Sequence, residues 1–242
     1  IIEYAGKRFL VDPMLGGKGS FAPFPFSHHQ KLRNPLHDLP MKAEDIVHNI
    51  DCVLLTHLHL DHIDDAAYKL LSKSVHIFVQ DEQDRNTVLS HGFTHVEIIG
   101  EDSRFGDIRL SKTESRHGHW WMLPLAGHTC GYVLRHETEP VCYLAGDTIW
   151  YCGVRRNIDR WSPQVIIVNA GGNKFHLGGH VIMHIPDVLK AMDYAPAATF
   201  VATHLEGVNH NQVTRVALRE EVMKCGKADR IHIPEDGEIV EL

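Results

Sequence analysis

The chain has 242 residues, of which 43% are hydrophobic and 23% are charged, a balance typical of a soluble globular protein. The formal net charge of −7 argues against a general nucleic-acid binder, which usually presents a basic face. No apolar run approaches the roughly 18 residues that a helix needs to cross a bilayer. We therefore expect a cytoplasmic protein with one domain over residues 1–242, and with neither nucleic acid nor a membrane as its partner.

Two residue types narrow the chemistry. The five cysteines form no C-x-x-C pair, so we interpret them as reduced, mostly buried thiols of a cytoplasmic protein. The 20 histidines are the unusual feature, because many stand beside glycine or aspartate in predicted loops. A neutral imidazole in such a place is available to a metal ion.

The first half of the chain alternates strands and helices. Residues 1–13 predict a hairpin that turns at Ala5-Gly6, followed by a long proline-rich segment over 13–40 that is either functional or disordered. Beyond it, the pattern predicts a buried strand over 51–57, a helix over 64–72, a strand over 75–80 and a helix over 81–92.

The second half begins with a run of short strands, mostly antiparallel, over 95–100, 107–115, 131–137 and 141–147. A buried strand over 164–172, a helix over 185–195, a strand over 198–204, a helix over 211–226 and a closing hairpin over 230–242 complete the predicted elements. This order predicts two similar α/β halves that pack sheet against sheet, with the helices outside.

The stretch "LLTHLHLDHIDD" over 54–65 contains the pattern H-x-H-x-D-H at the end of the first buried strand. Alternate residues of a strand share a face, so His57 and His59 are expected to point the same way. Asp61 and His62 follow in the turn and can reach a second position nearby. Imidazole and carboxylate ligands suit zinc, and also manganese or iron. A histidine-rich surface turn is disfavoured, because α/β folds build their sites at the carboxyl ends of strands.

This segment resembles the signature of the metallo-β-lactamase superfamily, a group of hydrolases with a four-layer αββα sandwich of the α/β (α+β) class. The resemblance covers nearly the whole chain. It implies an aspartate that bridges two metal ions and a final histidine, and Asp147 in "YLAGDTIW" and His204 in "FVATHLEG" stand at the matching positions.

The third histidine of the motif set has three candidates. His128 in "LAGHTCG" resembles the G-H-T-x-G motif of lactamases and glyoxalases. His117 in "ESRHGHWW" lies 30 residues before Asp147, as in the branch that contains L-ascorbate-6-phosphate lactonase and N-acylphosphatidylethanolamine-hydrolysing phospholipase D. We prefer His117, with His119 as a lesser rival on the same strand face.

The resemblance implies one metal held by His57, His59 and His117, a second held by Asp61, His62 and His204, and Asp147 as the bridge. Two divalent ions, zinc first with manganese or iron as alternatives, would supply a hydroxide nucleophile. The expected activity is hydrolysis of an ester, lactone or phosphodiester of a small polar metabolite. A nuclease of the same superfamily and a non-catalytic metal-binding protein are the alternatives. Whether the chain forms a homo-oligomer is left open.

Further residues near the motifs have two interpretations each. Asp12 either orients a histidine ligand or is a plain turn residue, and His210 either contacts substrate or shuttles a proton, or else begins a helix. We assign the catalytic roles to Asp61 and His210. The glycine-rich loop over 169–180, with Lys174, His176 and His180, is either a lid or a solvated loop. Asp187 is expected in a helix's first turn, and Trp120, Trp121 and Trp150 are expected in the core rather than in a pocket.

Overall fold

The computed structural model describes residues 1–121 and 127–242. Its first sheet has the strand order β1-β2-β3-β4-β5, and only the β1–β2 pair, the predicted hairpin at Ala5-Gly6, is antiparallel. The strands are β1 (Ile2–Tyr4), β2 (Lys7–Val11), β3 (Cys52–Leu54), β4 (His76–Val79) and β5 (His95–Ile98).

The second sheet has seven strands in the order β14-β13-β10-β9-β8-β7-β6. Strands β14, β13, β10 and β9 are parallel, and the pairs β9–β8, β8–β7 and β7–β6 are antiparallel. The strands are β6 (Ser103–Phe105), β7 (Ile108–Glu114), β8 (Cys130–Arg135), β9 (Cys142–Leu144), β10 (Val165–Asn169), β13 (Thr199–Thr203) and β14 (Ile231–His232). Strands β11 (Lys174–Phe175) and β12 (Gly179–His180) form a separate small hairpin.

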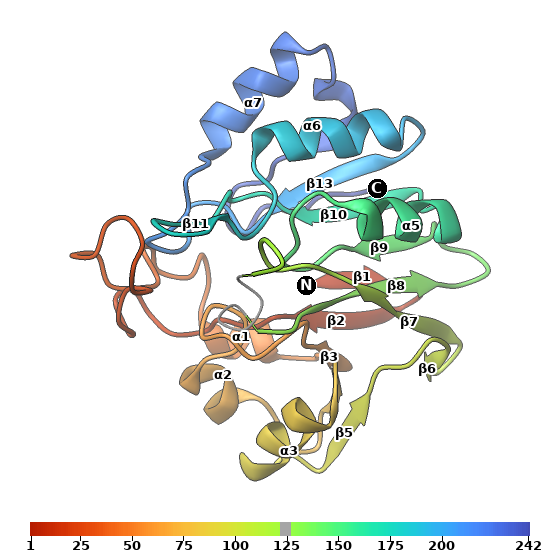
Figure 1. Ribbon diagram of the computed structural model, residues 1–242. Helices are drawn as coiled ribbons and strands as arrows, with labels where there is room; N and C mark the ends of the chain where they lie inside the picture. Colours follow the sequence, from red (N-terminus) through yellow and green to blue (C-terminus); the bar gives the residue numbers. More distant parts are fainter. Residues whose placement is uncertain (122–126) are drawn as a thin grey trace.

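The helices lie on the outer faces of the two sheets (Figure 1). Helices α1 (Ala43–Val47), α2 (Asp65–Leu70) and α3 (Glu82–Ser90) cover the five-stranded sheet, whereas α5 (Cys152–Trp161), α6 (Ile185–Tyr194) and α7 (Arg215–Lys224) lie on the other side. A short 3-10 helix, η1 (Ala228–Arg230), precedes β14. No helix of the described residues is long and apolar enough to span a membrane.

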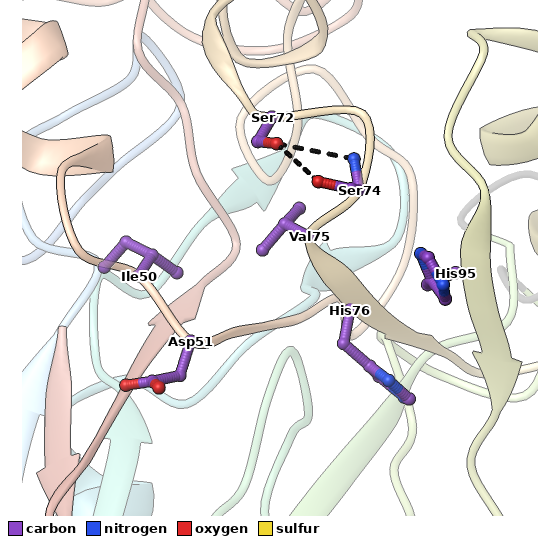
Figure 2. A pocket seen from close by; sticks show the side chains of 7 residues that line it. All are labelled: Ile50, Asp51, Ser72, Ser74, Val75, His76 and His95. Atoms are coloured by element: carbon purple, nitrogen blue, oxygen red, sulfur yellow. Dashed lines mark hydrogen bonds between the residues drawn. The ribbon is translucent and has the colours of Figure 1, made fainter.

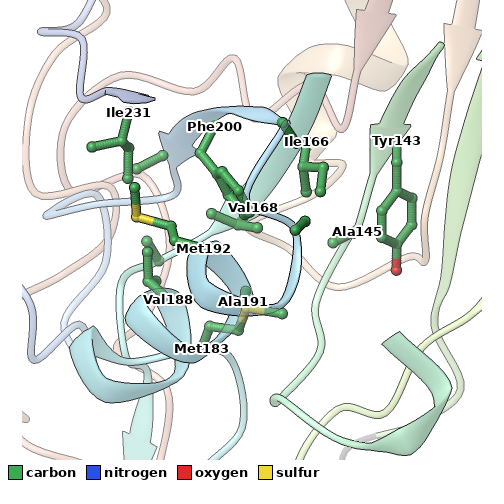
Figure 3. Close-up of a cluster of buried hydrophobic side chains, with 14 of the residues drawn as sticks. Tyr143, Ala145, Ile166, Val168, Met183, Val188, Ala191, Met192, Phe200 and Ile231 are labelled. Carbon is green, nitrogen blue, oxygen red and sulfur yellow. The ribbon is translucent and has the colours of Figure 1, made fainter. Parts of the chain in front are cut away.

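Three clusters of buried hydrophobic side chains separate the four layers. The first cluster joins the seven-stranded sheet to its helices, and Figure 3 shows Phe200 and Val168 of that sheet beside Met192 and Val188 of α6. The second lies between the two sheets, and the third joins the five-stranded sheet to α1, α2 and α3. The predicted αββα sandwich of the α/β (α+β) class is therefore confirmed.

Two of the expected elements differ from the prediction, and α5 is among the elements that it missed. Strand β5 is parallel to β4 rather than part of the antiparallel run. Residues 230–242 form no hairpin, because β14 pairs in parallel with β13 and no strand follows it. Helix α5 was not predicted, although its Ser162 cap is left-handed with φ 41°.

The proline-rich segment 13–40 is ordered against the loop that follows β13. The side chain of Asn209 makes most of this contact: its Oδ1 accepts from the Phe24 amide at 2.9 Å, and its Nδ2 donates to the His28 carbonyl at 2.8 Å. Ser27 also forms a bridge to Phe175 of β11. The segment is therefore ordered, which excludes the disordered alternative; its function stays a prediction.

The predicted motif residues follow strands that end at the same edge of the sandwich. Strands β3, β9, β10 and β13 lead into His57, Asp147, Ala170 and His204. Strand β7 runs antiparallel to β8, which is antiparallel to β9, so β7 and β9 point the same way and His117 emerges at this edge as well.

Candidate metal centre

Seven side chains from four loops form three overlapping groups of potential ligands, in each of which the ligand atoms lie within 4.8 Å of one another. The groups are His57, His59 and His117; His57, His62 and Asp147; and Asp61, His62 and His204. The first and third match the two predicted metal positions. The second draws one histidine from each, with Asp147 as its third member, which is the arrangement expected of a bridging carboxylate.

The first position consists of imidazoles alone. His57 Nε2 lies 2.9 Å from His59 Nδ1, and the His117 ring centroid is 5.5 Å from that of His57 and 5.4 Å from that of His59. Strand β3 ends at Leu54, so His57 and His59 lie in the following loop. We predicted a common direction for these two side chains from the alternation of residues along a strand. Because both residues lie beyond the strand, alternation does not explain why they point the same way.

The second position combines two histidines with a carboxylate. His62 Nε2 lies 3.3 Å from His204 Nε2, which in turn is 3.4 Å from Asp61 Oδ2. His204 adopts φ 59°, a left-handed conformation that a non-glycine residue rarely takes.

Asp147 lies between the two positions. Its Oδ2 is 3.2 Å from His62 Nε2 and 3.5 Å from His117 Nδ1, while its Oδ1 accepts a hydrogen bond from Asn169 Nδ2 at 2.6 Å. Asn169, at the end of β10, thus fixes the carboxylate. The sequence offered one hint of this role, because Asn169 ends the predicted strand "IIVNAGG" at the same sheet edge as the predicted ligands.

Three partners orient the histidine rings. Asp12 Oδ2 lies 2.8 Å from His62 Nδ1, Thr56 Oγ1 lies 3.0 Å from His57 Nδ1, and the Val181 carbonyl lies 3.1 Å from His117 Nδ1. Each contact occupies Nδ1, and in His57 and His62 Nε2 then faces the cluster. Of the two interpretations of Asp12, the orienting role agrees with this geometry.

The electrostatics of the cluster favour a bound cation. Burial, followed by the neighbouring His62 and His59, lowers the pKa of His57 well below its usual value, and burial lowers the pKa of His117 to about 4. Burial also opposes ionisation of Asp147, but His62 and His204 outweigh it and hold the pKa of Asp147 well below its usual range. Burial opposes protonation of His62 and His204, but the neighbouring carboxylates outweigh it and raise the pKa of both rings. These two histidines therefore give up a proton when an ion takes its place, and the set of imidazoles and carboxylates fits zinc, manganese or iron.

The rivals for the third histidine lie outside the cluster. His128 and His119 are both exposed, and neither belongs to a ligand group of the described residues. The His128 carbonyl instead accepts a hydrogen bond from Gln80 at 2.7 Å. The structure therefore brings His117 to the predicted site, and not the other two.

Residues predicted around the site have mixed outcomes. Trp150 packs against the first hydrophobic cluster as expected, but Trp120 and Trp121 are 76% and 48% exposed, so core packing is wrong for them. Asp187 lies in the first turn of α6, where it pairs with His184 at 3.0 Å. The loop with Lys174, His176 and His180 folds as the hairpin β11–β12, whose His176 amide donates to Phe26 of the proline-rich segment.

Two pockets of the surface are separate from the ligand cluster. The first, of about 370 Å³, lies at the start of β3, β4 and β5, where Figure 2 shows Asp51, His76 and His95 among the lining side chains. This is the opposite end of the strands from the metal ligands. The second, also about 370 Å³, lies between residues 29–37 and 206–214, beside the loop that follows His204.

Comparisons with known proteins agree with this fold and site. The family model described as "Beta-lactamase superfamily domain" matches residues 7–205. The UPF0173 protein YddR of Bacillus subtilis is 41% identical over 239 residues, which cover 98% of this chain and 94% of that protein. Other relatives carry the name UPF0173 metal-dependent hydrolase, such as one from Bacillus cereus that is 29% identical over 211 residues, 84% of this chain and 80% of that protein.

Two solved structures superpose closely. Isothiocyanate hydrolase from Delia radicum gut bacteria is 37% identical with a TM-score of 0.96, and the match covers 100% of this chain and 95% of that one. A structure described as a possible metal-dependent hydrolase from Veillonella parvula is 34% identical with a TM-score of 0.96, covering 99% and 94%.

The fold and the ligand cluster define a hydrolase of the metallo-β-lactamase fold. Within that class, the chain belongs to the beta-lactamase superfamily and to its UPF0173 family of metal-dependent hydrolases.

Proposed function

We propose that the chain hydrolyses a small organic electrophile with two divalent metal ions, of which zinc is the first choice and manganese or iron the alternatives. His57, His59 and His117 would hold one ion, Asp61, His62 and His204 the other, and Asp147 would bridge them. The observation that carries the proposal is that three ligand groups overlap through His57 and His62, with Asp147 reaching both positions.

The residues divide the work as follows. Metal ions at the two positions would lower the pKa of a bound water and polarise the substrate. Burial opposes ionisation of Asp61, but His62 and His204 outweigh it and keep the pKa of Asp61 low, so its carboxylate is ionised and can accept a hydrogen bond that orients the attacking water. His210, buried beside these groups, would contact the substrate. Asp61 and His210 are therefore the proposed catalytic residues.

The substrate has two candidate classes. The first is an ester, lactone or phosphodiester of a small polar metabolite, as in the lactonase and phospholipase D branch. The placement of His117, 30 residues before Asp147, supports membership of that branch. The second is an organic isothiocyanate, in which water adds to the central carbon and the C–N bond breaks: R–N=C=S and water give R–NH₂ and carbonyl sulfide.

The second class is favoured by the similarity to isothiocyanate hydrolase over the full chain. Exposed apolar side chains on loops near the site agree with it: Phe26, Trp120 and Leu177 are 79%, 76% and 80% exposed. These loops are adjacent, because Phe26 O accepts from the His176 amide at 2.9 Å and a side chain at Gly179 would lie 3.9 Å from the His119 ring. An apolar rim suits a neutral organic substituent better than a phosphorylated metabolite.

The test starts from protein stripped with a chelator and reloaded with zinc, manganese or iron, each separately. Metal content is measured first. An aryl ester, a γ-lactone, bis(nitrophenyl) phosphate and an arylalkyl isothiocyanate are then assayed, with amine release as the readout for the last. We expect two ions per chain and metal-dependent turnover that is lost in His57→Ala. Turnover that persists in His57→Ala or in stripped protein would sink the proposal.

A further inference from the structure

His210 is buried beside the metal centre, with its ring held between two aromatic side chains. It is 3% exposed, and its ring centroid lies 4.5 Å from that of Phe24 and 5.3 Å from that of Phe175. The His210 carbonyl accepts from the Lys174 amide at 3.0 Å, which ties the residue to the start of β11. The ring therefore has a defined orientation, and the question is which of its nitrogens carries the proton.

Two hydrogen-bonded asparagines, Asn211 and Asn173, answer this question. Their orientation can be traced from two backbone groups, one of which can only donate and the other only accept a hydrogen bond. The Val208 amide can only donate, and it donates to Asn211 Oδ1 at 2.8 Å. The His204 carbonyl can only accept, and it accepts from Asn211 Nδ2 at 3.1 Å. The orientation of the Asn211 side-chain amide follows from these two contacts.

The next link transfers this orientation to His210. Asn211 Nδ2 also donates to Asn173 Oδ1, so the oxygen of Asn173 faces Asn211 and its nitrogen faces away. That nitrogen, Nδ2, lies 3.1 Å from His210 Nε2. An amide NH₂ donates only, so Nε2 must accept, and the single proton of a neutral ring then lies on Nδ1.

The other side of the ring has no such partner. His210 Nδ1 is buried and makes no hydrogen bond within residues 1–121 and 127–242. The charged groups that act on the ring are Asp61, His204, Asp147 and His117, all members of the ligand cluster. Burial lowers the pKa of His210 to about 4, so the ring is neutral near pH 7. A buried N–H without a partner is costly, which makes it a site for a hydrogen-bond acceptor.

We propose that His210 donates a hydrogen bond from Nδ1 to the bound substrate, and that Asn173 and Asn211 are positioning residues that hold it in this tautomer. The inference rests on the proposed function of the site and sharpens it, since His210 then acts as a donor rather than a proton shuttle. The substrate class that fits has an acceptor atom that gains negative charge as water adds, such as a carbonyl oxygen or the sulfur or nitrogen of an isothiocyanate.

Gly171 allows the carbonyl of His204 and the side-chain amides of Asn173 and Asn211 to lie close together. A Cβ at this position would lie 2.1 Å from the His204 carbonyl oxygen, 2.2 Å from Asn211 Nδ2 and 2.8 Å from Asn173 Oδ1. The asparagine chain thus passes directly over a glycine that has no alternative residue.

The direct test is the ¹⁵N spectrum of the histidine rings, recorded on metal-free and zinc-loaded protein and assigned with His210→Asn. We expect a protonated Nδ1 and an unprotonated Nε2 for His210 in both. A proton on Nε2 would overturn the inference. Because this readout needs no substrate, it stands even if the protein hydrolyses nothing in the panel, so the failure of the inference and of the proposed function are distinguishable.

The kinetic test uses a matched pair. The side-chain amide of asparagine reaches the place of Nδ1, whereas that of glutamine reaches the place of Nε2. We expect both variants to lose activity, His210→Gln by about 10²-fold in kcat and His210→Asn by clearly less, with zinc content unchanged in both. Equal losses in the two variants would contradict the role of Nδ1.

The positioning residue is tested by Asn173→Leu, with Asn86→Leu on the exposed face of α3 as its control. We expect kcat to fall about tenfold with little change in KM, and the His210 proton to redistribute between Nδ1 and Nε2 in the ¹⁵N spectrum. An unchanged tautomer in Asn173→Leu would show that Asn173 does not set it.

Discussion

Asp12 Oδ2 lies 2.8 Å from Nδ1 of His62, and the same carboxylate accepts from the amide and the hydroxyl of Thr56 at 2.8 and 2.7 Å. One residue at the end of β2 thus holds a histidine of the second metal position and, through Thr56, the loop that begins the first. Asp12 itself has φ 46°, so the turn after β2 is built to present this carboxylate.

Replacing Asp12 should weaken metal binding without removing a ligand. Asp12→Asn keeps the shape but removes the charge that favours the Nδ1–H form of His62. We expect zinc affinity to fall by about tenfold to a hundredfold, measured by competition with a chromogenic chelator. Asp65→Asn, at an exposed position of α2, is the control. Equal affinities in the two variants would mean that Asp12 does not act through the metal.

The third histidine can be decided by metal content. His117→Ala removes a buried imidazole of the first ligand group, whereas His128→Ala removes an exposed one. We expect His117→Ala to bind about one zinc ion fewer than the unmodified protein and His128→Ala to bind the same number. Elemental analysis after gel filtration measures this, and zinc loss in His128→Ala alone would reverse the assignment.

Asn209 should govern the stability of the proline-rich segment. Asn209→Ala would leave the Phe24 amide and the carbonyl of His28 without their buried partner. We expect a loss of roughly 2–4 kcal/mol in the free energy of unfolding, measured by urea denaturation. Proteolysis within residues 21–34 should also become faster. The exposed Asn86→Ala is the matched control, and similar unfolding curves for both would argue against this contact.

The low pKa of His210 gives a pH dependence of known sign. Burial holds the folded-state pKa near 4, below the ordinary value of about 6.5, so between these values the unfolded chain binds a proton that the folded chain does not. This group therefore makes the metal-free protein less stable as pH falls from 6.5 to 4. We expect the difference in stability between His210→Asn and the parent to grow in the variant's favour over this range, measured by urea denaturation. Parallel profiles would contradict the shift.

The sequence predicts the fold best where one pattern dominates. The alternation of apolar runs with capped helices located β3, α2, β4 and α3, since each helix starts at an aspartate that accepts from the backbone. It failed at α5, where the amphipathic pattern follows a ligand motif without a strong start signal, because Tyr151 provides no side-chain cap. It also failed at β14, since only the neighbouring β13 decides whether a short apolar stretch pairs in parallel.

The site shows a similar division. The choice of His117 over His128 depended on the resemblance to the lactonase and phospholipase D branch, in which the third histidine lies about 30 residues before the bridging aspartate; spacing alone left both open. The residues that orient the ligands could not be predicted from the sequence. For Asp12, an orienting role and a plain turn position were equally plausible. Asn169 and Asn173 act through contacts with residues 22 and 37 positions away in the chain, and no local pattern encodes such contacts.

Gly171 joins two properties that a protein designer would wish to change separately. Any side chain there would collide with the carbonyl of His204, a proposed metal ligand, and with the amides of Asn173 and Asn211, which are proposed to hold His210 in place. A substitution at Gly171 would therefore disturb the proposed metal ligand and the residues around His210 together, so the two cannot be altered independently at this position. The exposed loops that carry Phe26 and Leu177 are not bound by this constraint. Substitutions there can change which substrate is preferred without changing the residues that hold the metal.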